Sequence, residues 1–175
     1  MVSANKNLQN LVSAGQLHLE APDADDIRHY LQRGDRYLAK ARTAASDGNN
    51  DDLFDYLYVA AFAYSWGALC LAGYRARDRY LAFQCLAYTT DIPREDWVFL
   101  SKLHNTRNDL EYGSRGKPHM ALSSLPSDWP TRFLQITERL NTDVYRIVST
   151  AMSSVFEGDD ERGAVAYKPK GATPS

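Results

Sequence analysis

The sequence Leu-His-Asn-Thr-Arg-Asn-Asp-Leu-Glu-Tyr-Gly occupies residues 103–113, in a stretch whose apolar residues have helical spacing. Residues that follow one another at steps of three, four and three lie on one face of an α-helix. Four residues here have that spacing: Leu100, Leu103, Arg107 and Leu110. An arginine therefore stands in line with leucines. Its stem is easily buried, but its guanidinium has five hydrogen-bond donors and no acceptor, so it needs a carboxylate, a phosphate, carbonyl groups or water. The stretch predicts a helix that carries one charged group on its apolar face.

Three other polar side chains lie on the same predicted helix, about one turn apart. His104, Asn108 and Tyr112 are spaced four residues apart, and Gly113 then supplies a residue type that commonly ends a helix. Together with Arg107, these three are the candidate catalytic residues. Tyr112 comes five positions after Arg107, so the two side chains point about 140° apart on an ideal helix. We expect them to cooperate only at a frayed helix end or across a two-fold axis between two copies.

Structural roles are the alternative interpretation of these residues. Arg107 has an ion-pair partner in Glu111, one turn further on, or in Asp52 or Asp55 across the bundle. A hydrogen-bonded histidine of the core or the surface explains His104 without any catalytic role.

The length and composition fit one globular domain. The chain has 175 residues, of which 44% are hydrophobic and 24% charged, and its formal net charge is −2. That charge gives no overall positive field for nucleic acid, although residues 74–117 hold a small local excess of Lys and Arg. Cys70 and Cys85 stand in apolar helical patterns without metal-type spacing, which is typical of reduced, buried cysteines. We expect no metal ion, no other cofactor, no secretory signal and a cytoplasmic location.

Helical periodicity predicts an all-α fold, an antiparallel four-to-five-helix bundle. The predicted bundle spans residues 23–157, after an N-terminal adaptor segment at residues 1–22 and before a disordered tail at residues 158–175. No stretch has the alternating pattern of a β-strand. The helix between Asp51 and Gly73 is apolar on most sides, so we expect it to be the most enclosed element.

One segment raises the alternative of a membrane span. Residues 56–74 contain no charged residue and are long enough to cross a bilayer. They are rich in Ala, Gly, Ser and Tyr, however, and lack the density of Leu, Ile and Phe that favours insertion. We therefore predict a buried bundle helix and no membrane association.

Basic side chains on either side of the helix that contains residues 103–113 in the sequence are candidates for binding nucleic acid. Together with the Arg-Asn pair of that helix, they are Arg75, Arg77, Arg79, Arg107, Asn108, Arg115 and Lys117. We expect the first three in a connector between helices, and the last two in a long loop after the helix that contains residues 103–113. Solvated charges of ordinary loops are the alternative interpretation.

The chain has, in order, an Asp-rich amphipathic helix, an Ala/Tyr-rich helix ending Ala-Gly-Tyr-Arg, a helix ending Thr-Arg-Asn-Asp-Leu-Glu-Tyr-Gly, and a long closing helix. This order, over residues 7–156, resembles the HEPN superfamily (higher eukaryotes and prokaryotes nucleotide-binding domains). Its members are helical bundles that usually dimerise, and many are metal-independent ribonucleases of toxin–antitoxin, CRISPR and phage-defence systems. Their site is an Arg, often followed by Asn, His or Asp, with a His after four to six residues. Arg107 and Asn108 match its first half, and Tyr112 stands in the place of the histidine.

The resemblance implies a HEPN-like module of the toxin–antitoxin or phage-defence type. It would form a homodimer, bind RNA, a nucleotide or a protein partner such as an antitoxin, and have a degenerate catalytic centre. A metal-independent ribonuclease is the alternative, in which Arg107 stabilises the phosphorane, Asn108 orients the substrate, and Tyr112 or His104 assists proton transfer. Whether the protein is an enzyme is therefore left open. A second alternative is a structural interaction protein in which Arg107 holds the bundle together.

Overall fold

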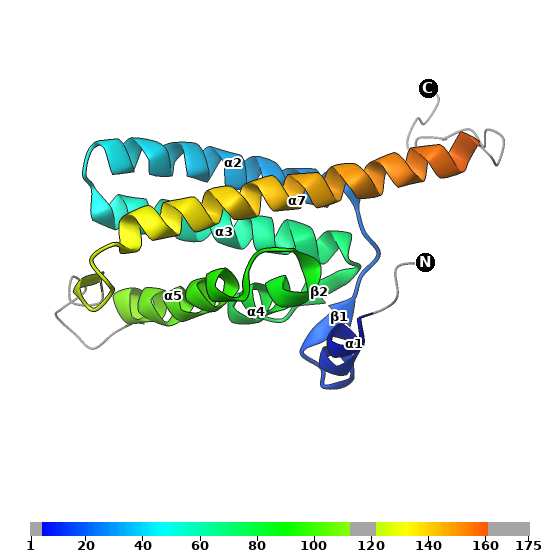
Figure 1. The fold of residues 1–175 in the computed structure, drawn as a ribbon. Coiled ribbons are helices and arrows are strands. Elements are labelled where there is room, and N and C mark those ends of the chain that lie inside the picture. Colours follow the sequence, from blue (N-terminus) through cyan, green and yellow to red (C-terminus); the bar gives the residue numbers. More distant parts are fainter. Residues whose placement is uncertain (1–4, 113–121, 161–175) are drawn as a thin grey trace, which may run out of the picture.

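The computed structural model describes residues 5–112 and 122–160, with the side chains of residues 5–111 and 122–152, and it is mostly helical (Figure 1). Six helices have both ends within these ranges: α1 (Lys6–Ser13), α2 (Ala24–Ser46), α3 (Asn50–Leu71), α4 (Arg79–Thr89), α5 (Arg94–Tyr112) and α7 (Trp129–Asp160). Two short strands accompany them: β1 (Leu17–Leu19) and β2 (Tyr74–Ala76). The prediction of a mainly helical fold is confirmed, whereas the prediction that no strand is present is wrong.

Helices α2 and α3 form an antiparallel hairpin, and α7 lies along both of them (Figure 1). Asp23 begins α2 as its N-cap residue, because its carboxylate accepts hydrogen bonds from the first free backbone N–H groups of the helix. Asn49 caps α3 in the same way, accepting from the N–H of Asp52 at 3.1 Å. Gly48, in the turn between the two helices, has a φ of +69°, which other residues rarely adopt. The hairpin is therefore encoded by local signals.

Helix α3 is the centre of the hydrophobic core. It has twelve buried residues, against six in α2, so the prediction that it is the most enclosed element is confirmed. Phe54 of α3 packs edge-on against the rings of Trp129 and Phe133 at the start of α7. Within the described residues, no helix is both long and apolar enough to cross a membrane.

A polar network joins α2, α3 and α7 at the edge of this core. The carboxylate of Asp35 accepts hydrogen bonds from the hydroxyl of Tyr64 at 2.8 Å, from the amide of Asn141 at 3.0 Å and from the hydroxyl of Tyr145. Gly34 lies directly against the Tyr64 ring, where an added Cβ would come within 2.4 Å of a ring carbon. The network therefore fixes the spacing of three helices.

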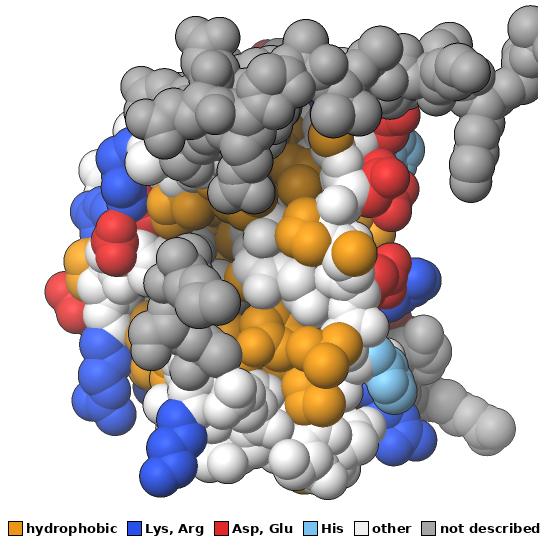
Figure 2. All heavy atoms as spheres, turned by 90° about the vertical axis from the view of Figure 1, so that its right-hand side faces the viewer, with side chains coloured by type: hydrophobic (Ala, Val, Ile, Leu, Met, Phe, Trp, Pro, Cys, Tyr) orange, Lys and Arg blue, Asp and Glu red, His pale blue; other side chains and the backbone are white. Residues whose placement is uncertain are grey.

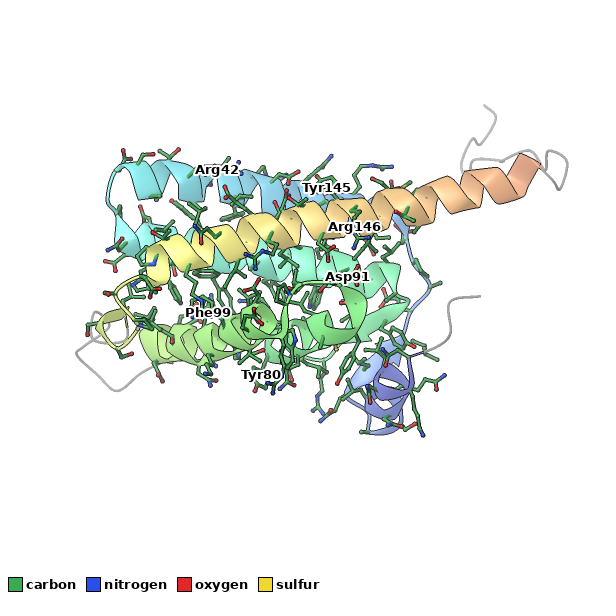
Figure 3. All side chains as sticks on the ribbon, in the orientation of Figure 1. Arg42, Tyr80, Asp91, Phe99, Tyr145 and Arg146 are labelled. Carbon is green, nitrogen blue, oxygen red and sulfur yellow. The ribbon has the colours of Figure 1, made fainter. Side chains whose placement is uncertain are left out.

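Helix α7 is also tied to the connection between α4 and α5. Arg146 of α7 pairs with Asp91 of that connection and with Asp143 of its own helix, and Figure 3 shows Arg146 and Asp91 facing each other. The backbone N–H of Asp91 donates to the Asp143 carboxylate at 2.7 Å. These contacts hold the start of α5 against the bundle.

The two strands form a small antiparallel ladder that fastens the N-terminal segment to the chain before α4. Leu17 is paired with Ala76, and Leu19 with Tyr74. Leu17, Tyr74 and Ala76 are buried, and the neighbouring Arg75 is exposed. A strand of three residues shows too little alternation to be recognised in a sequence, which explains the missed prediction.

The end of α7 differs from the expectation. The helix continues through Gly158 to Asp160, although the bundle was predicted to end at residue 157. One glycine costs a helix only about 1 kcal/mol relative to alanine, so it does not by itself end a helix of 32 residues. The remainder of the predicted tail, residues 161–175, lies outside the described residues. The C-terminal end of α7 extends past the ends of α2 and α3 (Figure 1).

Candidate functional site

Helix α5 turns its predicted apolar face towards the bundle. Leu100 and Leu103 are buried, and Leu110 packs against the core. Arg107 lies on the same face, with its guanidinium carbon 4.7 Å from the centroid of the Tyr58 ring. This is cation–π geometry over a buried ring. The arginine side chain is 19% exposed, so its head still reaches the surface.

The guanidinium of Arg107 is paired with a carboxylate of its own helix. Nη1 donates a hydrogen bond to Oε2 of Glu111 at 2.9 Å, and Nη2 contacts the other oxygen. The carboxyl of Asp55 on α3 is also affected: burial raises its pKa, and the positive charge of Arg107 opposes that rise. The ion pair with Glu111 expected under the structural interpretation is therefore present. Glu111 is 39% exposed, so its bonds compete with water and with other anions.

His104 is held between two polar side chains. Its Nδ1 lies 2.7 Å from the hydroxyl of Tyr58, and its Nε2 lies 3.1 Å from the amide nitrogen of Asn108. An amide nitrogen can only donate, so in this arrangement Nε2 accepts and the proton of the neutral ring is on Nδ1. Burial lowers the pKa of His104, and the nearby Asp78 opposes that shift. The imidazole is therefore neutral near pH 7, and it positions Asn108.

These side chains meet at an opening between the start of α4 and the exposed side of α5, which we name the α4–α5 cleft. Its volume is about 440 Å³, and it is lined by Asp78, Arg79, His104, Arg107, Asn108 and Glu111. Asp78 caps α4 by accepting from the N–H of Leu81 at 2.9 Å, which fixes where Arg79 begins the helix. The α4–α5 cleft therefore combines two guanidinium groups and an amide with two carboxylates.

An aromatic ring lies beside the α4–α5 cleft. The ring of Tyr80 is 5.5 Å from that of His104 and is 38% exposed. In Figure 3, Tyr80 lies on the side of the molecule away from α2. An exposed ring of this kind is a surface on which a nucleobase can stack.

Arg107 also borders a second hollow of about 400 Å³. It is lined by Asp51, Asp55, Val59, Arg107, Leu110, Glu111 and Leu122. Since Arg107 and Glu111 line both openings, their ion pair forms a shared wall. Three carboxylates surround the second hollow, so an anion is better accommodated in the α4–α5 cleft.

The predicted basic residues are divided between different places. Arg79 lines the α4–α5 cleft, but Arg75 lies on β2, where it pairs with Glu20 at 3.5 Å and approaches the Trp66 ring. The backbone N–H of Arg77 donates to the carbonyl of Gln16 at 3.2 Å and so extends the ladder. Successive residues of a strand point to opposite faces, so a short strand is enough to turn Arg75 away from the cleft.

Three of the predicted site residues lie wholly or partly outside the described residues. Tyr112 is the last residue of α5, and its side chain lies outside the described part, as do Arg115 and Lys117 entirely. Of the candidate catalytic residues, the structure therefore brings together Arg107, Asn108 and His104. Among the described residues, no group of three or more His, Cys, Asp or Glu is placed to hold a metal ion.

Three residues of the site were not identified from the sequence: Tyr58, Asp78 and Tyr80. Tyr58 stands in the uncharged segment that was interpreted as core, and its contact with His104 depends on how two helices face each other. Asp78 did have a sequence signal, because an aspartate just before an apolar helical run is typical of an N-cap. Recognising that cap would have placed Arg79 and Tyr80 in the first turn of a helix.

No family model matches the chain, and neither curated proteins nor solved structures give a match.

Proposed function

We propose that this protein is a HEPN-like module of the toxin–antitoxin or phage-defence type that binds RNA or a nucleotide in the α4–α5 cleft and has a degenerate catalytic centre. The observation that carries the proposal is that Arg79, Arg107 and Asn108, from two different helices, line one opening. Guanidinium groups bind phosphate through paired hydrogen bonds, and an amide can bond a base or a ribose hydroxyl. Tyr80 adds a surface for stacking.

Glu111 occupies the hydrogen-bonding positions of Arg107 that a phosphate would need. In this proposal the phosphate displaces the Glu111 carboxylate, and the exchange keeps the guanidinium paired in both states. The exposure of Glu111 supports the exchange, because an exposed ion pair contributes little free energy. Binding is then weakened by salt and by the presence of Glu111 itself.

Titration of a fluorescent single-stranded RNA, followed by anisotropy, tests the proposal. Arg107→Ala should weaken binding by roughly tenfold or more, since it removes a charge-assisted contact. Glu111→Gln should strengthen binding, because the competing charge is removed. The matched control is Arg42→Ala: Arg42 pairs with Glu138 at 2.9 Å on α7, outside the α4–α5 cleft.

The outcomes separate the proposal from the structural alternative. If Arg107 only holds the bundle together, Arg107→Ala lowers the melting temperature and leaves RNA binding unchanged. Equal effects of Arg107→Ala and Arg42→Ala, or no binding by the wild-type protein, would also overturn the proposal. Weaker binding by Glu111→Gln would show that Glu111 does not compete with the ligand.

Metal-independent RNA cleavage is a second candidate, favoured by the state of His104. A general base must be unprotonated, and burial keeps this imidazole neutral next to Arg107. Its Nε2 would first have to leave the amide of Asn108. RNA cleavage in EDTA that is lost in both His104→Ala and Arg107→Ala would establish this candidate and rule out a degenerate centre.

A further inference from the structure

An apolar groove of about 710 Å³ lies between the N-terminal half of α2, the end of α3 and the C-terminal half of α7. Figure 2 looks onto this end of the molecule and shows hydrophobic side chains gathered on its surface. Leu71, which lines the groove, is about 24 Å along α3 from Asp55, which lines a hollow together with Arg107. The groove therefore lies at the other end of the bundle from Arg107, and it shares no lining residue with the α4–α5 cleft.

The apolar floor of the groove is built from helices that are already fixed in position. Ile27 and Leu31, one turn apart on α2, and Val148 of α7 line the groove and are buried. Tyr145 of α7 also lines it, and its hydroxyl donates a hydrogen bond to Asp35, which belongs to the network that joins α2, α3 and α7. The groove is thus formed before any ligand arrives, as is usual for small-molecule sites.

One edge of the groove carries hydrogen-bond donors. Arg28 and Gln32 lie one turn apart on α2, and each is next in sequence to a residue of the buried floor. Among the described residues that line the groove, Arg28 is the one charged side chain, and Gln32 adds an amide. Nη1 of Arg28 donates to Asp25, but this ion pair is exposed and a guanidinium has five donors, so Arg28 can bond a second carboxylate. The groove therefore combines an apolar floor with a positively charged edge.

We propose that the groove binds a free medium-chain carboxylate, with its acyl chain on the apolar floor and its carboxylate at Arg28. The volume lies within the range of about 300–1,000 Å³ typical of small-molecule pockets, which are mostly apolar with a few polar groups. The lining residues of α2 extend from Ala24 to Gln32, about 12 Å along the helix, which is about the length of an extended decanoate chain. The positive edge favours an anionic head group over a neutral or cationic one. This proposal does not rest on RNA binding, because the two sites share no residue.

Calorimetric titration with decanoate, below the concentration at which it forms micelles, tests the charge of the ligand. One decanoate should bind per chain, and decyltrimethylammonium, which has the same chain and the opposite charge, should bind at least about fivefold more weakly. Arg28→Gln should weaken decanoate binding by about fivefold and remove the preference between the two head groups. The matched control is Arg42→Gln: Arg42 is similarly exposed on α2 and also pairs with a carboxylate, but it does not line the groove.

The proposal would be overturned by the absence of decanoate binding, by equal binding of the two head groups, or by equal effects of Arg28→Gln and Arg42→Gln. Association with vesicles of anionic lipid, without binding of free decanoate, would make the groove a membrane contact and would overturn it as well.

The length of the acyl chain and the properties of Met152 test whether the chain lies in the groove. Affinity should rise by about threefold for each CH₂ group between hexanoate and decanoate, and should level off once the chain fills the groove. Met152 lines the groove and is 41% exposed, so Met152→Glu should leave the fold intact and weaken decanoate binding by at least about tenfold. Tyr88→Glu is the matched control, because Tyr88 is 40% exposed but lies on α4 outside the groove. Equal effects of these two substitutions would place the acyl chain elsewhere.

Methyl NMR locates the ligand directly. The signal of Met152, assigned by its loss in Met152→Leu, should shift when decanoate is added, because Met152 lines the groove. Decanoate binding that leaves this signal unchanged would overturn the proposal, as would a dimer that Met152→Glu dissociates, since a second copy would then occupy the groove. RNA titration of Arg28→Gln completes the comparison: unchanged Arg107-dependent affinity shows that the groove and the α4–α5 cleft act separately.

Discussion

Asp35 and Arg107 are both charged side chains that stand among apolar residues on a helix, but their surroundings differ. Asp35 of α2 accepts hydrogen bonds from Tyr64 of α3 and from Asn141 and Tyr145 of α7. Arg107 of α5 is paired with Glu111 of the same helix and borders two hollows. The first group ties three helices together, and the second could exchange its carboxylate for another anion without separating any helices. The role of a charged side chain among apolar residues of a helix is thus better inferred from which helices its partners lie on than from its burial alone.

The same contrast extends to the two sides of the molecule. On the α2–α3–α7 side the helices are in close contact, and Gly34 leaves no room for a Cβ next to the ring of Tyr64. On the α4–α5 side, charged and aromatic side chains surround open space. We expect substitutions on the first side to change stability and those on the second to change binding.

The largest effect is expected for Gly34→Ala. The new Cβ would lie 2.4 Å from the Tyr64 ring, which is fully buried and held by Asp35, so the ring cannot easily move aside. We expect a loss of about 3 kcal/mol in the free energy of unfolding, measured by urea denaturation. Gly67→Ala is the matched control, because its Cβ would meet its nearest neighbour at an ordinary 3.5 Å. It should be neutral or stabilising, and similar losses in both variants would show that α2 and α3 are not closely packed at Gly34.

A smaller difference is expected between Asp35→Ala and Arg107→Ala. Asp35→Ala leaves the hydroxyl of buried Tyr64 without its acceptor and should lower the free energy of unfolding by about 2 kcal/mol. Arg107→Ala removes an ion pair within one helix and a cation–π contact, together about 1 kcal/mol. Urea denaturation of both variants measures the difference. A larger loss for Arg107→Ala would mean that Arg107, and not Asp35, is the structural ion.

The smallest effect concerns the pH dependence of stability. The folded protein lowers the pKa of His104 through burial, so the unfolded chain takes up a proton on this residue at a higher pH than the folded chain does. The contribution of neutral His104 to the free energy of unfolding is therefore fully present above the usual histidine pKa of 6.5. It is lost as the pH falls below 6.5 towards the pKa of His104 in the folded protein. His104→Gln should flatten this part of the profile of stability against pH. An unchanged slope in His104→Gln would mean that the imidazole titrates alike in both states.

Much of the fold could be predicted because its helices have local signals. Asp23 and Asn49 cap helices, Gly48 makes the turn between them, and the stripe of α7 is regular. The pairing of Arg107 with Glu111 was also among the expectations, since residues four apart meet on a helix. These features depend only on short sequence distances.

The contacts between helices could not be predicted. Tyr58 meets His104 across α3 and α5, but α3 is apolar on nearly all sides, so its pattern does not say which side faces which neighbour. The separation of Arg75 from Arg79 depends on a strand of three residues, too short for its alternation to be noticed.

The ladder of β1 and β2 makes the beginning of the chain a support for a distant surface. Leu17 is paired with Ala76, two residues before the aspartate that caps α4, and Leu8 packs into the same small cluster as Leu81. Removal of the first nineteen residues would therefore unfasten the start of α4 and displace Arg79, although none of the described residues among them lines the α4–α5 cleft. A truncation at this end would therefore change the α4–α5 cleft from a distance, through the lost hydrogen bonds of the ladder and the lost packing of Leu8.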